Sequence, residues 1–475
     1  MKLPFSSNRA ATVAISFAAS VMLLSGCIES GKFVWNADGT EAAICANDGL
    51  RFCDATGKLS DTQLKTPDEL AWSKDGKRLF VVTHVDGLTW NEVAAQLPGA
   101  RRDLVEAQGD LFAKSAQQPG VTAAEFGKQL HGKISHDALN EILLYLNAKH
   151  DDELKSVFGK DWNNYEITPA SMYTVASYAH AGDKLTDEQI IWRNTKALTG
   201  VRPCPTGDGR MLAVQDGRNL YLLGAGGEPI LLVEGCSKYC DWSPDGKSVY
   251  FFLESSEEKS PDWVAKIDTS KLGPGAGLLK DHQPGDIQKL VALKYYKDSR
   301  VRCLPDGRLL LATAEATQKT KPDVFGRKTI YAETFYTLAP GSSIAEQLGH
   351  SNEFVNKCGY CSFETSPDSH KVVLATENGS IRVLPALPHA GATKEIAPDN
   401  NNPSPFAPCF RTDEELCYAS GAPKGDSRDV VLHNLKTNAT TNISASWPKT
   451  AVAGILIKEE AQQNRFEDFL NALYQ

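Results

Sequence analysis

The chain has 475 residues, with 50 Lys+Arg against 59 Asp+Glu and a net charge of −9 at pH 7. Hydrophobic residues make up 41% of it, which is typical of globular proteins and excludes a disordered, collagen-like or low-complexity chain. The acidic balance argues against a nucleic-acid partner, because binding phosphates requires a cationic surface. Length alone predicts two or three domains.

The N-terminus places charged, apolar and small residues in a fixed order. A sparse cationic start precedes a short apolar stretch from Ala10 to Leu24, which ends in Leu24-Ser25-Gly26-Cys27. This ending resembles a lipobox, in which a peptidase cleaves before the cysteine and the thiol carries diacylglycerol. We therefore predict that residues 1–26 are a signal peptide and that Cys27 is lipidated. The alternative is an ordinary signal peptide. A membrane-spanning anchor fits less well, because the stretch is short for one.

The predicted anchor also sets the location of the protein. Residues 1–26 hold two positive and no negative side chains, so the mature chain carries −11 and is held by acyl chains, not by attraction to anionic lipid. Ile28 and Glu29 follow the cysteine, and the absence of Asp there resembles enterobacterial lipoproteins of the outer membrane. We predict the periplasmic face of the outer membrane, with the inner membrane as the alternative. Residues 27–32 form an acylated tether that reaches about 20 Å.

One sequence unit recurs seven times after the tether. It joins an aromatic or apolar residue, a turn that contains Asp, and an alternating strand, and its clearest copy is Asp241-Trp242-Ser243-Pro244-Asp245-Gly246-Lys247. Trp35, Trp72 and Trp242 each stand three residues before the turn aspartate, which indicates a true repeat. The last two copies lack Gly after Asp. The turn aspartates are Asp38, Asp75, Asp208, Asp245, Asp306, Asp368 and Asp413.

The turn composition predicts a tight reversal between two strands, because Pro presets φ, Asp binds backbone amides and Gly accepts positive φ. The strands expected after the turns are Arg78 to Thr83, Met211 to Val214, Ser248 to Leu253, Leu309 to Thr313, Lys371 to Thr376 and Leu416 to Ala419. The strands expected next are Asn219 to Leu223, Trp263 to Ile267, Thr329 to Thr337, Ser380 to Leu384 and Asp429 to Leu435. Seven copies of a four-stranded unit predict a β-propeller.

The Trp-Ser-Pro-Asp-Gly-Lys core resembles the repeat of TolB-type and related WD-like β-propellers over residues 33–450. The resemblance implies a mainly β fold with seven blades, with six or eight as alternatives, and an innermost strand before each turn that lines the central channel. It says little about function, because propellers host scaffolds, lyases and sugar binders alike. No N-terminal domain like that of TolB fits before Phe33, so the partners of TolB are not transferred.

The spacing of the turn aspartates predicts an insertion. Asp75 and Asp208 stand 133 residues apart, and the sequence between them has helical spacing over Asn91 to Gln118 and Ser135 to Phe158. We predict an α-helical insertion at residues 88–168, between the second and third strands of the second blade. This connection opens on the same face as the one that enters each inner strand, so one face is elaborated. Residues 451–475 predict a C-terminal amphipathic helix.

Ten cysteines remain beside Cys27, an even number that predicts five disulfides in an oxidising compartment. The pairing we favour joins cysteines close in sequence, and the left-over pair is the last named: Cys236 with Cys240, Cys358 with Cys361, Cys45 with Cys53, Cys409 with Cys417, and Cys204 with Cys303. Two alternatives stay open. Cys358 and Cys361 resemble a thioredoxin-type redox pair, and the same two with Cys236 and Cys240 have the layout of a zinc site.

Other chemistry is sparse. The chain has no Gly-x-Ser-x-Gly elbow, phosphate-binding glycine loop or His-Glu-x-x-His motif. Two histidine groups could form metal or base sites but are better explained as surface residues: His131, His136 and His150, near Glu141 and Asp151, and His84, His282, His370 and His433. The three repeat tryptophans favour packing between blades over a sugar platform. We predict no catalytic residue, metal or cofactor.

These features predict a noncatalytic envelope lipoprotein, whose propeller is a scaffold for an envelope protein partner that docks on the elaborated face. The alternative is a periplasmic enzyme or ligand binder, directed at polysaccharide, that uses the mouth of the channel.

Overall fold

The structure is a computed structural model. It describes residues 33–448 apart from the segments 47–48, 134–135, 165–168, 183, 216–217, 225–228, 238, 256–261, 271–286, 294–298, 319–328, 350–362, 376–379, 388–391, 398–405 and 421–428. The predicted signal peptide, tether, Cys27 and C-terminal helix therefore lie outside the described residues. No helix among the described residues is long and apolar enough to cross a membrane.

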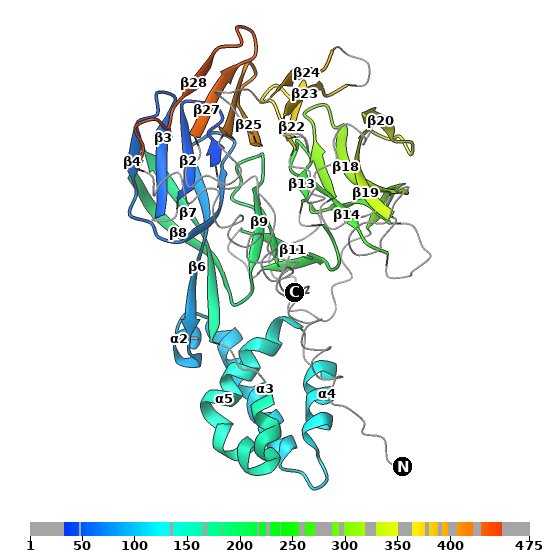
Figure 1. Cartoon of the computed structure of the whole chain (residues 1–475). Helices are drawn as coiled ribbons and strands as arrows, with labels where there is room; N and C mark the ends of the chain where they lie inside the picture. The colour runs from blue at the N-terminus through cyan, green and yellow to red at the C-terminus, as the bar shows by residue number, and fades with distance from the viewer. Residues whose placement is uncertain are drawn as a thin grey trace, which may run out of the picture.

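The described strands form seven antiparallel sheets, each of four strands that follow one another along the chain (Figure 1). This arrangement confirms the predicted seven-bladed β-propeller. The first three blades comprise β1 (Phe33–Trp35), β2 (Glu41–Ala46), β3 (Gly49–Asp54), β4 (Leu59–Asp61); β5 (Pro67–Trp72), β6 (Arg78–Leu88), β7 (Ala170–Ala181), β8 (Lys184–Asn194); and β9 (Leu198–Pro203), β10 (Met211–Gln215), β11 (Asn219–Leu223), β12 (Ile230–Val233).

The remaining blades have the same order of strands. They comprise β13 (Asp241–Trp242), β14 (Ser248–Leu253), β15 (Trp263–Asp268), β16 (Gln288–Ala292); β17 (Arg300–Cys303), β18 (Leu309–Gln318), β19 (Thr329–Leu338), β20 (Glu346–Gly349); β21 (Phe363–Thr365), β22 (Lys371–Ala375), β23 (Ile381–Pro385), β24 (Lys394–Ile396); and β25 (Phe406–Thr412), β26 (Glu415–Ser420), β27 (Asp429–Asn434), β28 (Thr440–Asn442).

The predicted strands agree with these bounds to within one or two residues in most blades. The exceptions are β6 and β18, which each run five residues further than predicted, to Leu88 and Gln318. The alternation of apolar residues ends earlier, because the outer half of β6 is exposed on both faces. Pairing with β7 carries the strand on through the exposed Val85, Asp86 and Gly87 to the buried Leu88, which lies opposite Ala170.

The turn after each inner strand closes as its sequence predicts. In blade 4 the amide of Gly246 donates to the carbonyl of Ser243 at 2.9 Å. The Asp245 carboxylate accepts from the Ser243 hydroxyl at 2.6 Å and from the amide of Lys247 at 3.1 Å. Gly246 has a φ of +67°, which L side chains rarely adopt.

The turns of neighbouring blades touch one another. Arg210 of blade 3 donates to the carbonyl of Gly246 at 2.8 Å, and the amide of Asp368 in blade 6 donates to Asp413 of blade 7 at 2.7 Å. Arg411 of blade 7 donates to the carbonyl of Gly39 in blade 1 at 2.8 Å. The turns therefore lie on one face of the ring, which we call the turn face.

The ring closes between blades 7 and 1 through side chains, since no strand is shared between the two described sheets. One apolar cluster spans the contact and includes Ile44, Cys53, Leu432 and Ile443. The indole of Trp447 also donates to the carbonyl of Gly57 at 2.6 Å. A Cβ at residue 57 would stand 2.0 Å from a backbone oxygen of blade 7, so this position requires glycine.

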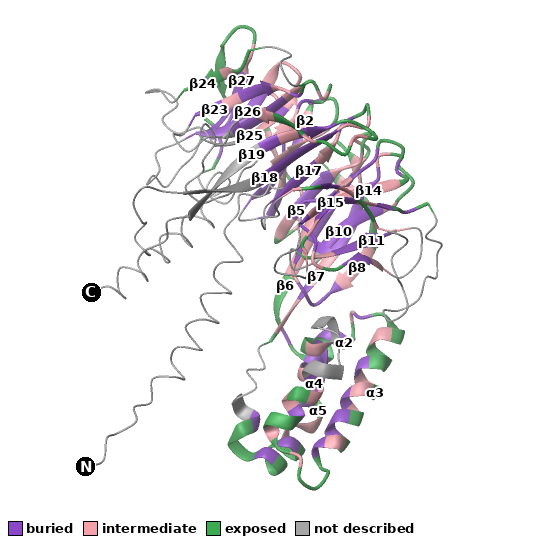
Figure 2. Ribbon diagram, turned by 90° about the vertical axis from the view of Figure 1, so that its right-hand side faces the viewer, coloured by how far each residue is buried: buried purple, intermediate pink, exposed green. Residues whose placement is uncertain are grey.

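The predicted helical insertion leaves the ring between β6 and β7, the second and third strands of blade 2. It consists of α2 (Trp90–Ala94), α3 (Gly99–Ala116), α4 (Ala123–Lys133), α5 (His136–Phe158) and the 3-10 helix η1 (Gly159–Asn164). These helices project from the ring as a separate body (Figure 1), and the purple residues in Figure 2 lie within it. Its own core includes Trp90, Phe126 and Trp162.

Two contacts define how the insertion is built. Gly109 of α3 lies against the ring of Tyr145 in α5, and a Cβ there would stand 2.2 Å from that ring. The buried Glu141 of α5 accepts from Arg101 at 2.9 Å and from Thr195 at 3.1 Å. Because Thr195 follows β8, Glu141 joins the insertion to the propeller.

Candidate functional site

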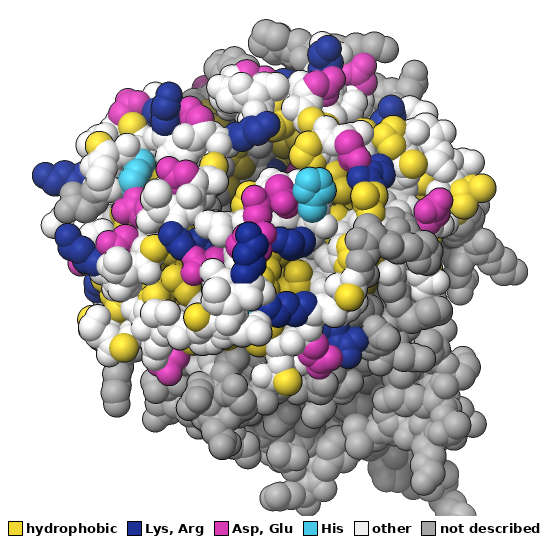
Figure 3. Space-filling model, turned by 90° about the horizontal axis from the view of Figure 1, so that it is seen from above, with side chains coloured by type: hydrophobic (Ala, Val, Ile, Leu, Met, Phe, Trp, Pro, Cys, Tyr) yellow, Lys and Arg dark blue, Asp and Glu magenta, His cyan; other side chains and the backbone are white. Residues whose placement is uncertain are grey.

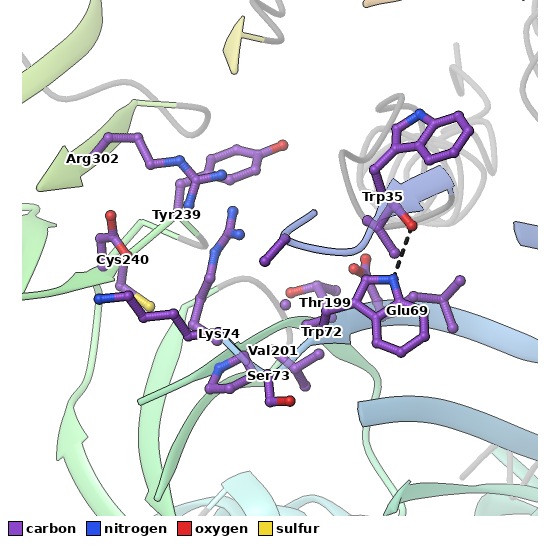
Figure 4. A pocket seen from close by; sticks show the side chains of 18 residues that line it. Trp35, Glu69, Trp72, Ser73, Lys74, Thr199, Val201, Tyr239, Cys240 and Arg302 are labelled. Atoms are coloured by element: carbon purple, nitrogen blue, oxygen red, sulfur yellow. Dashed lines mark hydrogen bonds between the residues drawn. The ribbon is translucent and has the colours of Figure 1, made fainter. Parts of the chain in front are cut away.

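A pocket of about 370 Å³ lies among the inner strands of blades 1 to 5. Such a volume is within the range of small-molecule sites, about 300–1,000 Å³. Figure 4 shows Lys74, Tyr239, Cys240 and Arg302 together on one side of it and Trp35 on the other. The pocket is thus a part of the central channel that the inner strands were predicted to line.

Four charged residues occupy equivalent positions around this channel. In each of blades 3 to 6, the backbone amide of one residue before the turn donates to a carbonyl after it. These residues are Cys204, Ser243, Leu304 and Ser366. The residue two positions earlier carries a charge whose sign alternates from blade to blade: Arg202, Asp241, Arg302 and Glu364. Blades 1 and 2 have Val34 and Ala71 at this position, although blade 2 also places the buried Glu69 in the lining of the pocket.

Three of these four charges have partners. The Arg302 guanidinium and the Glu364 carboxylate form an ion pair at 3.1 Å. Asp241 accepts from the amide of Cys303 at 2.9 Å and from its neighbour Trp242 at 3.0 Å. Among the described residues, none forms a hydrogen bond or ion pair with the guanidinium of Arg202. The backbone carbonyl of Arg202 accepts a hydrogen bond from the indole of Trp242.

The surroundings of Arg202 disfavour its charge. Burial lowers the pKa of Arg202 below its usual value, and repulsion by Arg302 adds to this, while Glu364 and Asp241 act in the opposite sense. Arginine nevertheless stays protonated at neutral pH. The site therefore holds a half-buried cation that lacks a bonded anion among the described residues.

The wall beside Arg202 is rigid. Tyr239 is buried, and the guanidinium carbon of Arg300 lies 3.7 Å from the centroid of its ring. The Ser237 hydroxyl donates to the carbonyl of Ser299, which ties blade 4 to blade 5 at the same level. Burial also raises the pKa of the Cys240 thiol to about 12, so this residue lines the pocket as a neutral thiol.

The pocket opens toward the turn face. Its lining includes Ala37, Ser73 and Lys74, which belong to the turns of blades 1 and 2, and the Lys74 side chain is exposed. The insertion lies at the other end of β6, on the opposite face. Figure 3, seen from the end of the molecule away from the insertion, shows Lys and Arg mixed with Asp and Glu near the centre of this face.

A second surface lies on α3 of the insertion. One side of this helix, at Val105, Gly109, Phe112 and Ala116, is buried against the other helices. A neighbouring side carries the exposed residues Ala100, Leu104, Ala107 and Leu111, of which Leu111 is 66% exposed. The spacing of four, three and four residues is that of an apolar seam in packed helices. We call this the α3 stripe.

The structure places one predicted cysteine pair together and two predicted pairs apart. Cys409 lies directly opposite Cys417 in the register of β25 and β26, and the two side chains are hydrogen-bonded. Cys45 and Cys53 do not meet, so that pairing is wrong. Cys53 lies opposite Ala42, and the two thiols point into the clusters on opposite sides of blade 1.

The pairing of Cys204 with Cys303 is also wrong. Cys204 packs with Cys236 and Cys240 between blades 3 and 4, whereas Cys303 packs between blades 4 and 5. Cys358 and Cys361 lie outside the described residues, so the redox pair and the four-cysteine zinc site stay untested. The eight described cysteines are thiols in this structure.

Among the described residues, the members of the two histidine groups do not come together. His84 pairs with Asp68 in blade 2, His370 with Asp368 in blade 6, and His433 is buried in blade 7. In the insertion, His150 contacts Asp110 at 2.8 Å, while Glu141 and Asp151 bind other residues. His282 and the side chains of His131 and His136 lie outside what is described. In the described part of the chain, no three His, Cys, Asp or Glu are placed to hold a metal.

The packing role predicted for the repeat tryptophans is confirmed in two blades. Trp72 donates to the carbonyl of Val34 at 3.0 Å, and Trp242 donates to that of Arg202 at 2.9 Å, in each case in the preceding blade. An arginine of the preceding blade also covers the ring at two positions, Arg411 over Trp35 at 5.4 Å and Arg210 over Trp242 at 5.3 Å.

The four alternating charges of blades 3 to 6 were not predicted from the sequence. The sequence signal for two of them is a second repeated element, Val-Arg, which precedes two of the turns as Val201-Arg202 and Val301-Arg302. Charged residues in inner strands depart from the apolar alternation, and departures of this kind mark functional positions.

No family model and no curated protein matches the chain. Among solved structures, the chain is similar to a putative TolB from Agrobacterium tumefaciens (14% identity, 54% of this chain and 84% of that one, TM-score 0.36). It is also similar to TolB from Acinetobacter baumannii (14%, 56% and 58%, TM-score 0.35) and to hydrazine synthase from Kuenenia stuttgartiensis (12%, 86% and 96%, TM-score 0.46). These similarities concern the fold alone, and the seven four-stranded sheets agree with the predicted TolB-like, WD-like propeller.

Proposed function

We propose that this protein is a noncatalytic lipoprotein of the cell envelope, whose propeller holds the helical insertion toward the membrane to dock a protein partner there. The observation that carries the proposal is the exposed α3 stripe, on a helical body with its own core. Exposed apolar residues at regular spacing on a helix are typical of a docking surface.

The strand direction supports the orientation. β1 begins at Phe33 and runs toward the turn face, so the predicted tether enters the ring on the face from which the insertion projects. The tether, residues 27–32, reaches about 20 Å. The insertion is longer than that, because α5 with its 23 residues extends about 35 Å. Lipidation of Cys27 would therefore bring the α3 stripe close to the membrane.

The charge of the insertion favours a protein over lipid as the occupant. Residues 88–168 hold eight Lys+Arg against twelve Asp+Glu, a net charge of −4, so an anionic membrane surface would repel them. We propose as occupant an amphipathic helix of a membrane-associated envelope protein, with apolar residues at heptad spacing and Lys or Arg on its flanks. A coiled-coil contact of this kind matches the spacing of the stripe, and its cationic flanks match the acidic charge of the insertion as a whole.

The anchor is tested by replacing Cys27→Ala and feeding cells an alkyne-bearing fatty acid. We expect the label on the wild-type protein alone, and the variant in the soluble periplasmic fraction. An unlabelled wild-type protein, or a variant that stays with the membrane, would contradict the anchor.

The docking surface is tested with a photocrosslinking amino acid at Leu111 in intact cells. We expect one protein adduct of defined mass, which Leu104→Glu reduces at least about five-fold, because a buried charge disfavours an apolar contact. The same amino acid at Lys160, an exposed position of the insertion outside the stripe, is the matched control. No adduct at Leu111, an adduct with lipid alone, or equal adducts at both positions would refute the proposal.

The alternative predicted from the sequence, a polysaccharide-directed enzyme or ligand binder, stays a prediction. If it holds, the channel pocket is its place, since the α3 stripe is an open convex surface.

A further inference from the structure

We infer that the channel pocket binds the carboxylate of a small acidic ligand, of about one or two sugar rings in size, with Arg202 as the residue that receives it. This inference concerns the turn face and is independent of the docking surface on the insertion. It rests on the charge, the volume and the opening of the pocket.

The charges around the pocket single out Arg202. Arg302 is already engaged by Glu364, and the Asp241 carboxylate is engaged by two backbone amides. A half-buried guanidinium without a bonded anion favours an anionic ligand, and a bidentate carboxylate is the group that its planar fork fits best. Arg202 lines the pocket, so an incoming ligand can contact this residue.

The other walls define the body of the ligand. Lys74 stands exposed at the mouth and supplies a second cation. Val34, Ala71 and Trp72 provide an apolar surface on the other side of the pocket, next to the buried Glu69, which also lines it. A carboxylate attached to a ring fits this combination, because the ring packs on the apolar wall while the charge meets Arg202. A divalent cation is disfavoured, since the three cations of the lining, Lys74, Arg202 and Arg302, outnumber its two carboxylates, Glu69 and Asp241.

The pocket is suited to binding, and the thiol in its wall is not a reactive nucleophile. The Cys240 thiol is neutral because burial raises its pKa to about 12, and thiolate is the reactive form. The inference is recognition of the ligand, and no chemical step is assigned to the pocket.

The test is isothermal titration of the full mature chain with three probes: glucuronate, glucose as its neutral counterpart, and succinate as a carboxylate without a ring. We expect saturable binding of glucuronate, weaker binding of succinate and none of glucose. Arg202→Gln should weaken glucuronate binding about ten-fold or more, because a charge-assisted hydrogen bond is lost. Arg202→Lys should lie between the two.

The matched control is Arg218→Gln, which removes one positive charge at an exposed residue paired with Glu254 and should leave binding unchanged. Lys74→Glu tests the same pocket from its exposed rim, should Arg202→Gln fail to fold in a thermal melt. Absence of glucuronate binding, equal affinity for glucose, or binding that neither Arg202→Gln nor Lys74→Glu weakens would overturn the inference. Photocrosslinking at Leu111 should be the same in all of these variants.

Discussion

At the scale of single residues, the same contacts recur around the ring because the repeat places the same atoms at each blade boundary. The indole of Trp242 reaches back to a carbonyl of blade 3, as Trp72 does to blade 1. Both residues belong to the three that stand out in the sequence. These contacts bury a polar group with its partner, so each fixes the angle between two sheets without leaving a buried donor unpaired.

Replacing Trp242→Phe tests this contact. We expect a loss of about 1–3 kcal/mol in the free energy of unfolding, because the carbonyl of Arg202 is left buried without its donor. Urea denaturation measures it. Trp263→Phe is the control, since that ring is only partly buried and should change stability by less than about 0.5 kcal/mol. Equal losses in both variants would show that the bond between blades contributes nothing.

The turn aspartates predict how stability depends on pH. The Ser243 hydroxyl lowers the pKa of Asp245, and although burial alone raises the pKa of Asp368, hydrogen bonds from Ser366 and His370 lower it to about 2. A pKa that is lower in the folded than in the unfolded chain stabilises the fold above the unfolded value, about 4. This stabilisation is lost as the pH falls from about 4 to about 2.

Urea midpoints at pH 7, 4 and 2.5 measure this effect. We expect the turn aspartates to change the urea midpoint little between pH 7 and pH 4, and to lower it clearly below pH 4. Asp368→Asn should lose less stability than the wild type over the lower interval, because position 368 no longer titrates. A wild-type midpoint that is unchanged at pH 2.5 would contradict the assignment.

At the scale of elements, the insertion depends on one buried carboxylate. Glu141 bridges Arg101 of α3 and Thr195 of the propeller. Without it, the helical body would still have its apolar core but would lose its polar fastening to blade 2. The orientation of the α3 stripe therefore depends on Glu141 together with the apolar packing of Leu88 and Met172, from β6 and β7, in the core of the insertion.

Glu141→Ala should destabilise the protein by about 3 kcal/mol, because it leaves Arg101 without its buried partner. Limited proteolysis should cut first within residues 88–168. Glu153→Ala removes an exposed carboxylate of the same helix, 54% exposed, and should leave both readouts unchanged. A Glu141→Ala variant as stable and as protease-resistant as the wild type would argue against this fastening.

The facing strands β25 and β26 predict one disulfide. Cys409 and Cys417 lie opposite each other, so in an oxidising compartment they should form a bridge worth about 2–3 kcal/mol by the loop it closes. Peptide mapping without reduction should find this bridge and no bridge between Cys45 and Cys53. Alkylation of both Cys409 and Cys417 before reduction would contradict it.

The outcome for the elements shows what the sequence could predict. The turns could be predicted from the sequence because their chemistry is local. Their number and spacing then predicted the seven blades and the position of the insertion. The pairing of Cys45 with Cys53 failed because register decides it: Cys45 faces Leu50, so Cys53 falls on the other side of the sheet. The alternating charges of blades 3 to 6 could not be predicted for a related reason. Arg202 and Asp241 become neighbours only when separate blades stand side by side.

At the scale of the whole molecule, the two faces of the ring have different roles. The turn face carries the mouth of the pocket with Lys74. The other face carries the start of β1 and the insertion, and in our proposal it is turned to the membrane. The strand direction links these assignments, because every inner strand runs toward the turn face, so the proposed lipid anchor and the pocket lie at opposite ends of β1.

The orientation is tested most directly by fluorescence quenching in vesicles that hold the lipidated protein and a nitroxide-labelled headgroup lipid. A fluorescent amino acid is placed either at Leu111 on the α3 stripe or at Lys74 at the mouth of the pocket. We predict strong quenching at Leu111 and little at Lys74, because the thickness of the ring separates the mouth from the bilayer. Stronger quenching at Lys74, or no difference between the two positions, would contradict the account.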